Sequence, residues 1–281
     1  MRYLINTVNT KIQQLSKGYF QSGYGSGSDV MLVVGSCRSV PYLNYINYLN
    51  AGNRFSIHFI DPFNFNYDSM DRRVDFESAV NQCESNAQLL DLLKRTRYYI
   101  HEYYNSFGMF NSSRDNPKNI YQFGLNPEYD ICIPNFNDIF ILFQDIVDFC
   151  PEVRKDLQAD IRVAGAITND SIERVRDLGL INLEKFFTIC KMSSFPDMES
   201  LVRNEWRIRR FFWNSNHVSK HFTISIFKML NDQFLKMDAD SAFWDRINNE
   251  DMFSTPHTPM TNQDVKGYGL MWNEMSHNLR I

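Results

Sequence analysis

A five-residue segment, Gly35-Ser36-Cys37-Arg38-Ser39, joins an apolar run to a stretch with helical spacing. Glycine permits the tight turn that such a junction requires. Backbone N–H groups at a helix start favour negative charge, so they lower the pKa of a nearby thiol and can hold an oxyanion. Arg38 adds positive charge next to Cys37 in the sequence. The segment therefore predicts a cysteine nucleophile at a strand-to-helix turn; the alternative is a structural cysteine buried at a strand end.

A thiol nucleophile needs a base, and histidine is the usual one. His217 falls in a predicted loop just before a helix, where a functional side chain is well placed, and it is the favoured base. His257, ten residues before Gly267, is the second candidate. For each histidine the alternative is a solvated loop side chain. His217 and His221 would share a face if one helix covered both, a spacing that can bind zinc. However, no third ligand is evident, and we expect no metal site.

The residues around this turn predict alternating strands and helices in the first part of the chain. The run 30–35 is apolar and rich in valine, as is typical of a central parallel strand covered on both faces. Residues 41–50 have helical spacing, and Pro41 suits a first helical turn. Further along, we expect a strand at 54–62, one or two helices within 75–104, and a strand from 129 that breaks at Pro134 and continues as a helix.

The second half is predicted to be mostly helical. A capping-type sequence at Asn169 or Asp170 begins one helix. Residues 159–165 fit either a short strand or a helix end. Further helices are expected at 198–216, at 219–237 and near 268–275. Strand–helix alternation followed by helices predicts one α/β domain over residues 30–281, preceded by an arm and a flexible Gly/Ser-rich segment at 1–29.

Composition narrows the class of protein. The chain has 281 residues, enough for one large domain or two small ones, and 43% of them are hydrophobic. Its net charge of -4 argues against a general nucleic-acid-binding surface. Five cysteines without a CxxC pair argue against a disulfide framework and favour reduced thiols in a cytoplasmic setting. No apolar run reaches the length of a membrane span, and the N-terminus lacks the apolar core of a signal peptide.

Three segments carry a resemblance to a known superfamily. The segment Val-Val-Gly-Ser-Cys-Arg-Ser resembles the first block of the SGNH (GDSL) hydrolases, which reads apolar-Gly-Asp-Ser-x-Ser. Cys37 falls where that superfamily has its serine, and Ser36 falls where it has aspartate. A cysteine at this point resembles the GSCFA family and the WcbI-type polysaccharide biosynthesis enzymes, which carry Gly-Asn-Cys-Gln. Residues 207–230 resemble the WcbI-type pattern that contains Asn-His-Pro, with Val218 in place of the proline, and residues 255–272 resemble its C-terminal stretch.

The resemblance implies a flavodoxin-like (SGNH-like) three-layer sandwich with a parallel central sheet and a helix-rich second half. It also implies acetyl transfer from coenzyme A, as acetyl-coenzyme A, to a carbohydrate or similar hydroxyl acceptor. The alternatives are an SGNH-type esterase or deacetylase, and a non-catalytic module on the same fold that binds a glycan or a protein.

Site residues follow from the resemblance together with residue chemistry. The segment Ile-Pro-Asn-Phe-Asn-Asp loosely resembles the SGNH Gly-x-Asn-Asp block and makes Asn137 an oxyanion donor, unless it is a turn cap. The remaining oxyanion or substrate candidates are Gly35, Ser36, Arg38 and Asn216. Three arginines at helical spacing are candidates for coenzyme A phosphates or an anionic glycan, or form a solvated basic face: Arg203, Arg207 and Arg210.

Overall fold

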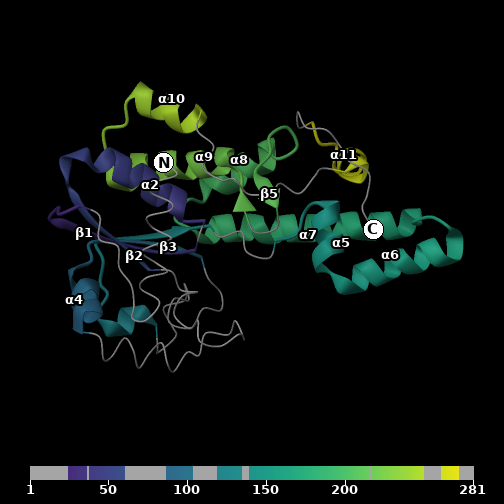
Figure 1. Ribbon diagram of the computed structural model, residues 1–281, viewed down its shortest axis with the longest axis horizontal. Helices are drawn as coiled ribbons and strands as arrows, with labels where there is room; N and C mark the ends of the chain where they lie inside the picture. Colours follow the sequence, from purple (N-terminus) through teal and green to yellow (C-terminus); the bar gives the residue numbers. More distant parts are fainter. Residues whose placement is uncertain are drawn as a thin grey trace. The chain divides into compact units, whose positions relative to one another are not determined.

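The computed structural model describes residues 25–36, 38–60, 87–103, 119–134, 139–214, 217–249 and 261–271. The chain divides into two compact units, each built from two separate stretches of sequence (Figure 1). One unit comprises Met1–Asn135 and Ile226–Met252, and the other comprises Phe136–Ser225 and Phe253–Ile281. Among the described residues, no helix combines the length and the apolar character that crossing a bilayer requires.

The first unit is built on a parallel sheet of four strands in the order β2-β1-β3-β4. The strands are β1 (Asp29–Val34), β2 (Phe55–Ile60), β3 (Tyr98–Glu102) and β4 (Tyr129–Ile133). The chain places β2 on one side of β1 and then crosses to the other side for β3, so the order reverses at β1. The predicted central parallel strand at 30–35 is thereby confirmed.

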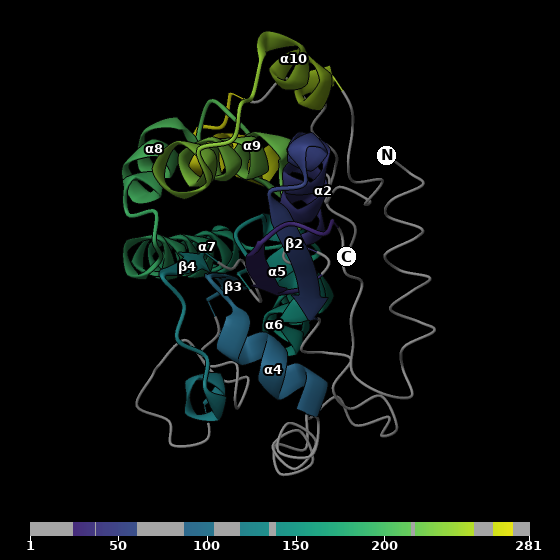
Figure 2. The same ribbon diagram turned by 90° about the vertical axis from the view of Figure 1, so that its left-hand side faces the viewer.

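Helices cover both faces of this sheet. Alternate residues of β1 join an apolar cluster with α4 (Ala87–Arg95) and its neighbours, which includes Val30, Leu32, Val34, Leu89, Leu92, Leu93 and Tyr99. The helix α2 (Val40–Leu49) lies on the opposite face from α4 (Figures 1 and 2). Connections between parallel strands are right-handed. Because the chain moves from β1 to β2 on one side and then to β3 on the other side, the two connecting helices lie on opposite faces of the sheet. Burial on both faces explains why β1 is apolar throughout.

The stretch 226–252 belongs to this unit through aromatic contacts with α2. The helix α9 (Lys220–Leu230) continues as a π-helical turn, Asn231–Leu235, and is followed by α10 (Ser241–Asn249). The ring of Tyr45 lies 5.0 Å from Phe227 and 6.2 Å from Phe243, centroid to centroid. These three rings are buried, so they form one apolar layer outside the sheet.

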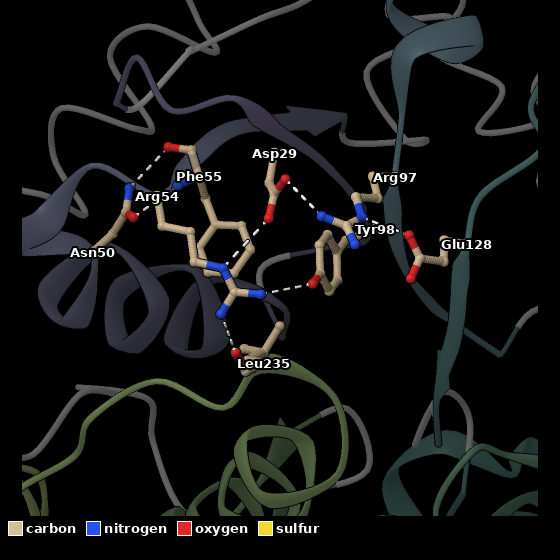
Figure 3. A network of polar contacts seen from close by, with 8 residues as sticks. All are labelled: Asp29, Asn50, Arg54, Phe55, Arg97, Tyr98, Glu128 and Leu235. Atoms are coloured by element: carbon tan, nitrogen blue, oxygen red, sulfur yellow. Dashed lines mark hydrogen bonds and ion pairs between the residues drawn. The ribbon is translucent and has the colours of Figure 1, made fainter.

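Opposite charges alternate along the edge of the sheet at which the strands begin (Figure 3). Arg54 pairs with Asp29 at 3.3 Å, Asp29 with Arg97 at 2.8 Å, and Arg97 with Glu128 at 2.6 Å. Each residue stands immediately before or at the start of one strand, so the row follows the strand order. Arg54 also donates to the backbone oxygen of Leu235 at 2.6 Å. The row thus ties the end of the π-helical turn to the sheet.

The second unit is mostly helical. It contains α5 (Phe143–Phe149), α6 (Pro151–Ala164), α7 (Asn169–Met192), α8 (Asp197–Glu205), the start of α9, and α11 (Asn262–Tyr268). A short antiparallel pair, β5 (Phe212–Asn214) and β6 (His217–Val218), precedes α9. The helices α5, α6 and α7 share an apolar core made by Phe143, Ile146, Val147, Val153, Leu157 and Val175.

The helix α11 is held in the second unit by two buried polar side chains. The Asp264 carboxylate accepts from the backbone N–H groups of Thr261 and Phe143, both at 2.8 Å. The Tyr268 hydroxyl donates to the backbone oxygen of Ile141 at 2.9 Å. These contacts satisfy backbone groups at the starts of α11 and α5. The Gly-Tyr segment near the C-terminus therefore has a structural role.

Four predicted element boundaries differ from the structure. Within 75–104, α4 ends at Arg95 and β3 follows, because Tyr98–Glu102 pairs between β1 and β4. The helix predicted at 198–216 ends at Glu205. The β5–β6 pair covers the end of that predicted helix and the loop predicted before α9. Residues 269–271 of the helix predicted near 268–275 are not helical, because α11 ends at Tyr268, and 272–275 lie outside the described residues. The open choice at 159–165 resolves as the end of α6.

Candidate functional site

The segment 35–39 connects β1 to α2 at the edge where the strands end. The strand β1 ends at Val34, and α2 begins at Val40 with Ser39 as its N-cap residue. The prediction of a strand-to-helix connection here is confirmed. Cys37 itself lies outside the described residues, so the site is built from the residues on either side of it.

A buried carboxylate from the neighbouring strand holds this turn. Glu102, the last residue of β3, is only 2% exposed. Its Oε1 accepts from the Ser36 backbone N–H at 2.8 Å and from the Ser39 hydroxyl at 2.6 Å. The Ser36 hydroxyl also donates to both carboxylate oxygens, at 3.1 and 3.2 Å. Glu102 therefore fixes the turn on both sides of Cys37.

Arg38 completes a buried ion pair at the same place. Its Nε lies 3.5 Å from Glu102 Oε2, and both side chains are less than a tenth exposed. Two opposite charges at this distance largely cancel at points further away. The turn therefore carries a compensated pair, whereas the sequence predicted a single cation beside the thiol.

The described amide groups of the turn already have acceptors. The Ser36 N–H donates to Glu102, the Arg38 N–H donates to the Ser36 hydroxyl oxygen at 3.3 Å, and the Ser39 N–H donates to the Ser36 backbone oxygen at 2.9 Å. An oxyanion at any of these three groups would have to replace an existing acceptor. The amide of Ser36 is the least available, because its partner is a charged oxygen.

Gly35 is required for space rather than for an unusual backbone angle. A Cβ added there would lie 2.7 Å from the Ser39 Cβ and 2.8 Å from Glu102 Oε1, with the Ser39 hydroxyl closer still. Real Cβ atoms do not approach other heavy atoms this closely. Only glycine lets Ser39 and Glu102 meet across the turn.

A second polar group holds the end of β3 from the other face. The ring of His101 places Nδ1 3.2 Å from the Glu102 backbone oxygen and Nε2 3.1 Å from Asp130 Oδ1. The Tyr121 hydroxyl donates to Asp130 Oδ2 at 2.7 Å. His101 is buried with both ring nitrogens engaged, so it supports the strand end and is not placed to act as the base.

The side chains of both predicted bases lie outside the described residues. His217 begins β6, but its side chain, together with Asn216, Asn137 and His257, lies outside the described residues. The Cys37–His217 pair therefore stays a prediction. His221 belongs to α9 and His217 to β6, so one helix does not cover both, and the condition for a shared zinc-binding face is not met.

The surroundings of His221 lower its pKa. Its Nε2 lies 3.5 Å from Glu205 Oε2. Burial, reinforced by the nearby Arg209, lowers the pKa of His221, although Glu205 opposes the shift. Among the described residues, no group of three or more His, Cys, Asp or Glu side chains is arranged to hold a metal ion.

The three predicted arginines do not share a helical face, because α8 ends at Glu205. Arg203 donates to Glu184 and Glu199 at 3.0–3.1 Å, which raises the pKa of its guanidinium. Arg207 donates to the Tyr268 backbone oxygen at 3.0 Å. Arg210 is buried and donates to the Phe212 backbone oxygen at 2.6 Å. A phosphate would have to compete with these partners, so the described residues do not form a ready cradle for coenzyme A.

Glu102 is the site residue that sequence reasoning missed. The segment 98–102 was predicted to be helical, and a helical glutamate has no reason to meet residue 36. A usable signal was present, because Tyr-Tyr-Ile-His is rich in strand-forming residues and is short, as buried strands are. An acidic residue at the end of such a strand belongs to the same sheet edge as the turn.

Comparison with known proteins gives one weak structural likeness. No family model and no curated protein matches the chain. A solved structure of WcbI, described as a novel polysaccharide biosynthesis enzyme, in its native form without a disulfide bond between coenzyme A and a cysteine, is similar with a TM-score of 0.46. The identity is 11%, over 89% of this chain and 81% of that chain. A likeness at this level assigns neither a family nor an activity.

Proposed function

We propose that the chain is an acyltransferase that moves an acetyl or similar acyl group to a hydroxyl of a carbohydrate or similar acceptor. The observation that carries the proposal is the position of the 35–39 turn, at the carboxyl ends of β1 and β3 where the strand order reverses. Open parallel sheets bind ligands at this point. The order β2-β1-β3-β4 is also that of the first strands of flavodoxin-like sheets, which fits the fold implied by the motif.

In the proposed reaction, Cys37 and His217 act together. His217 takes the thiol proton, and the Cys37 sulfur attacks the acyl carbonyl of the donor. The donor's leaving group departs with the proton from His217, which leaves an acyl-cysteine. His217 then takes the proton of the acceptor hydroxyl as its oxygen attacks the acyl carbon, and the cysteine leaves as the thiolate and is reprotonated. Asn216 and Asn137 supply the oxyanion donors, because the described amides of the turn are engaged.

Coenzyme A is the acyl carrier that the sequence resemblance implies, and when bound it would supply the acyl group as a thioester. The cationic groups proposed to meet its phosphates are either Arg38 or the arginines at 203, 207 and 210. Because Arg38 and Arg203 already pair with carboxylates, we expect weak binding that falls with ionic strength. Titration calorimetry with coenzyme A measures this, and no binding at millimolar concentration would shift the proposal towards hydrolysis.

A second function, ligand binding without turnover, is favoured by one observation. The amide of Ser36 donates to Glu102, and those of Arg38 and Ser39 donate within the turn, whereas an acyltransferase needs donors aimed at the acyl oxygen. In this case the turn would be a rigid wall of a glycan- or protein-binding site.

Trapping of the acyl-enzyme distinguishes the two functions. The full chain is incubated with acetyl-coenzyme A without an acceptor, digested, and analysed by mass spectrometry. Acetylation confined to the Cys37 peptide, and its loss after a carbohydrate acceptor is added, supports acyl transfer. Cys37→Ala and Cys150→Ala are matched variants, and only the first should prevent labelling. No acetylation of Cys37 would favour the binding function.

A further inference from the structure

We propose that Glu102 is a positioning residue for the thiol of Cys37: its carboxylate fixes the turn and balances the charge of Arg38. The inference deepens the proposed function and rests on it in taking Cys37 as the reactive group. It concerns a residue on a different strand, which is far from the turn in sequence.

The geometry assigns Glu102 two tasks. Hydrogen bonds to Ser36 and Ser39 fix the backbone on both sides of Cys37. The contact with Arg38 sets the charge of the same segment. Glu102 from β3 and Arg38 from the turn itself form an ion pair at this segment. On the same strand, His101 faces Asp130 on the other side of the sheet.

The balance of charge has a direct consequence for the thiol. A lone Arg38 would stabilise the thiolate, and a lone Glu102 would destabilise it. With both present, the two effects largely cancel. Removing either charge should therefore move the titration of Cys37, and the two removals should move it in opposite directions. If the two substitutions only loosened the turn, they would have no reason to move the titration of Cys37 in opposite directions.

The experiment measures the pH midpoint of Cys37 alkylation by iodoacetamide in the full chain, followed by mass spectrometry of the Cys37 peptide. Glu102→Gln keeps an acceptor oxygen for Ser36 and Ser39 but removes the charge, so the midpoint should fall. Arg38→Gln should raise it. Each shift should be roughly 1–2 pH units, as expected for a unit charge about 6–12 Å away at an effective dielectric constant of about 20. The double variant should return close to the parent.

Matched controls separate the shift in the Cys37 midpoint from a general loss of structure. Glu128→Gln removes a carboxylate that also pairs with an arginine, but at the opposite edge of the sheet, and should leave the Cys37 midpoint unchanged. The Cys150 peptide in the same digests reports any general change in alkylation. Circular dichroism verifies that each variant is folded.

Shifts of the same sign, or no shift, in the two single variants would overturn the proposal. Opposite shifts without any acyl transfer would leave it standing and reject the proposed function. If Cys37 stays unmodified in all forms, the proposed function fails, and the same four proteins are compared by urea denaturation. Non-additive effects of the two substitutions on stability would then support the ion pair, and additive effects would overturn it.

Discussion

At the scale of single residues, the turn depends on space as much as on charge. Gly35 leaves room for the Ser39 hydroxyl and the Glu102 carboxylate to meet, and Glu102 replaces water for three donors at once. A buried carboxylate is tolerated when it is paired and hydrogen-bonded in this way.

We expect Gly35→Ala to destabilise the protein by roughly 1–3 kcal/mol, because the added methyl group would displace Ser39 and Glu102. Urea denaturation measures the loss. Gly52→Ala is the matched control, since a Cβ there would meet nothing within 4 Å. Equal stability of the two variants would mean that the turn tolerates a side chain at position 35.

The catalytic pair gives a second prediction at this scale. Cys37→Ala and His217→Ala should each abolish turnover, and the double variant should lose little more, because residues that act as a unit are not additive. His257→Ala should have a smaller effect. Rates of acyl transfer to a carbohydrate acceptor test the ranking, and the opposite order would assign the base to His257.

At the scale of elements, the two edges of the sheet have different roles. The edge where the strands end carries the turn, with a buried charge pair. The edge where they begin carries the exposed row from Arg54 to Glu128, which follows the strand order (Figure 3). Exposed pairs contribute little individually, but a row that links all four strands opposes their separation.

The row predicts a dependence of stability on pH. Hydrogen bonds from Arg97, and then from Tyr129, lower the pKa of Glu128 below its usual 4.5. The stabilisation that ionised Glu128 gives the folded state is therefore present above about pH 4.5. It is lost as the pH falls through the lower pKa that Glu128 has in the folded state. Glu128→Gln should melt at a lower temperature than the parent at pH 7, and the difference should shrink below pH 4.5. High salt should also reduce the difference. A difference that is independent of pH would contradict the role of the charge.

At the scale of the whole molecule, each unit is made from two separate stretches of chain. The sheet unit needs 226–252, because Phe227 and Phe243 complete the apolar layer against Tyr45. The helical unit needs the C-terminal stretch, because Asp264 and Tyr268 satisfy backbone groups of the segment 141–143. Neither unit can therefore be cut out as one continuous piece of sequence.

Phe227→Ala tests whether the sheet unit depends on the stretch 226–252. Loss of a fully buried ring should cost roughly 3–5 kcal/mol. Hydrogen exchange should then become faster in the peptides of β1 to β4, although the substituted residue lies far away in sequence. Phe149→Ala, at an exposed position, is the control and should have little effect. Unchanged protection of the strands would show that the sheet does not depend on 226–252.

The sequence by itself determined the local features. The valine-rich run and the glycine after it specify β1 and its turn, because an apolar strand and a tight turn depend on neighbouring residues. The start of α7 follows from local capping, although the cap residue is Thr168 and not the predicted Asn169 or Asp170. Only the tertiary structure decided that the helical pattern stops before 98–102, since this short strand-forming segment pairs with β1 and β4. The same pairing brings Glu102 to Ser36, 66 residues away, and local sequence does not specify that contact.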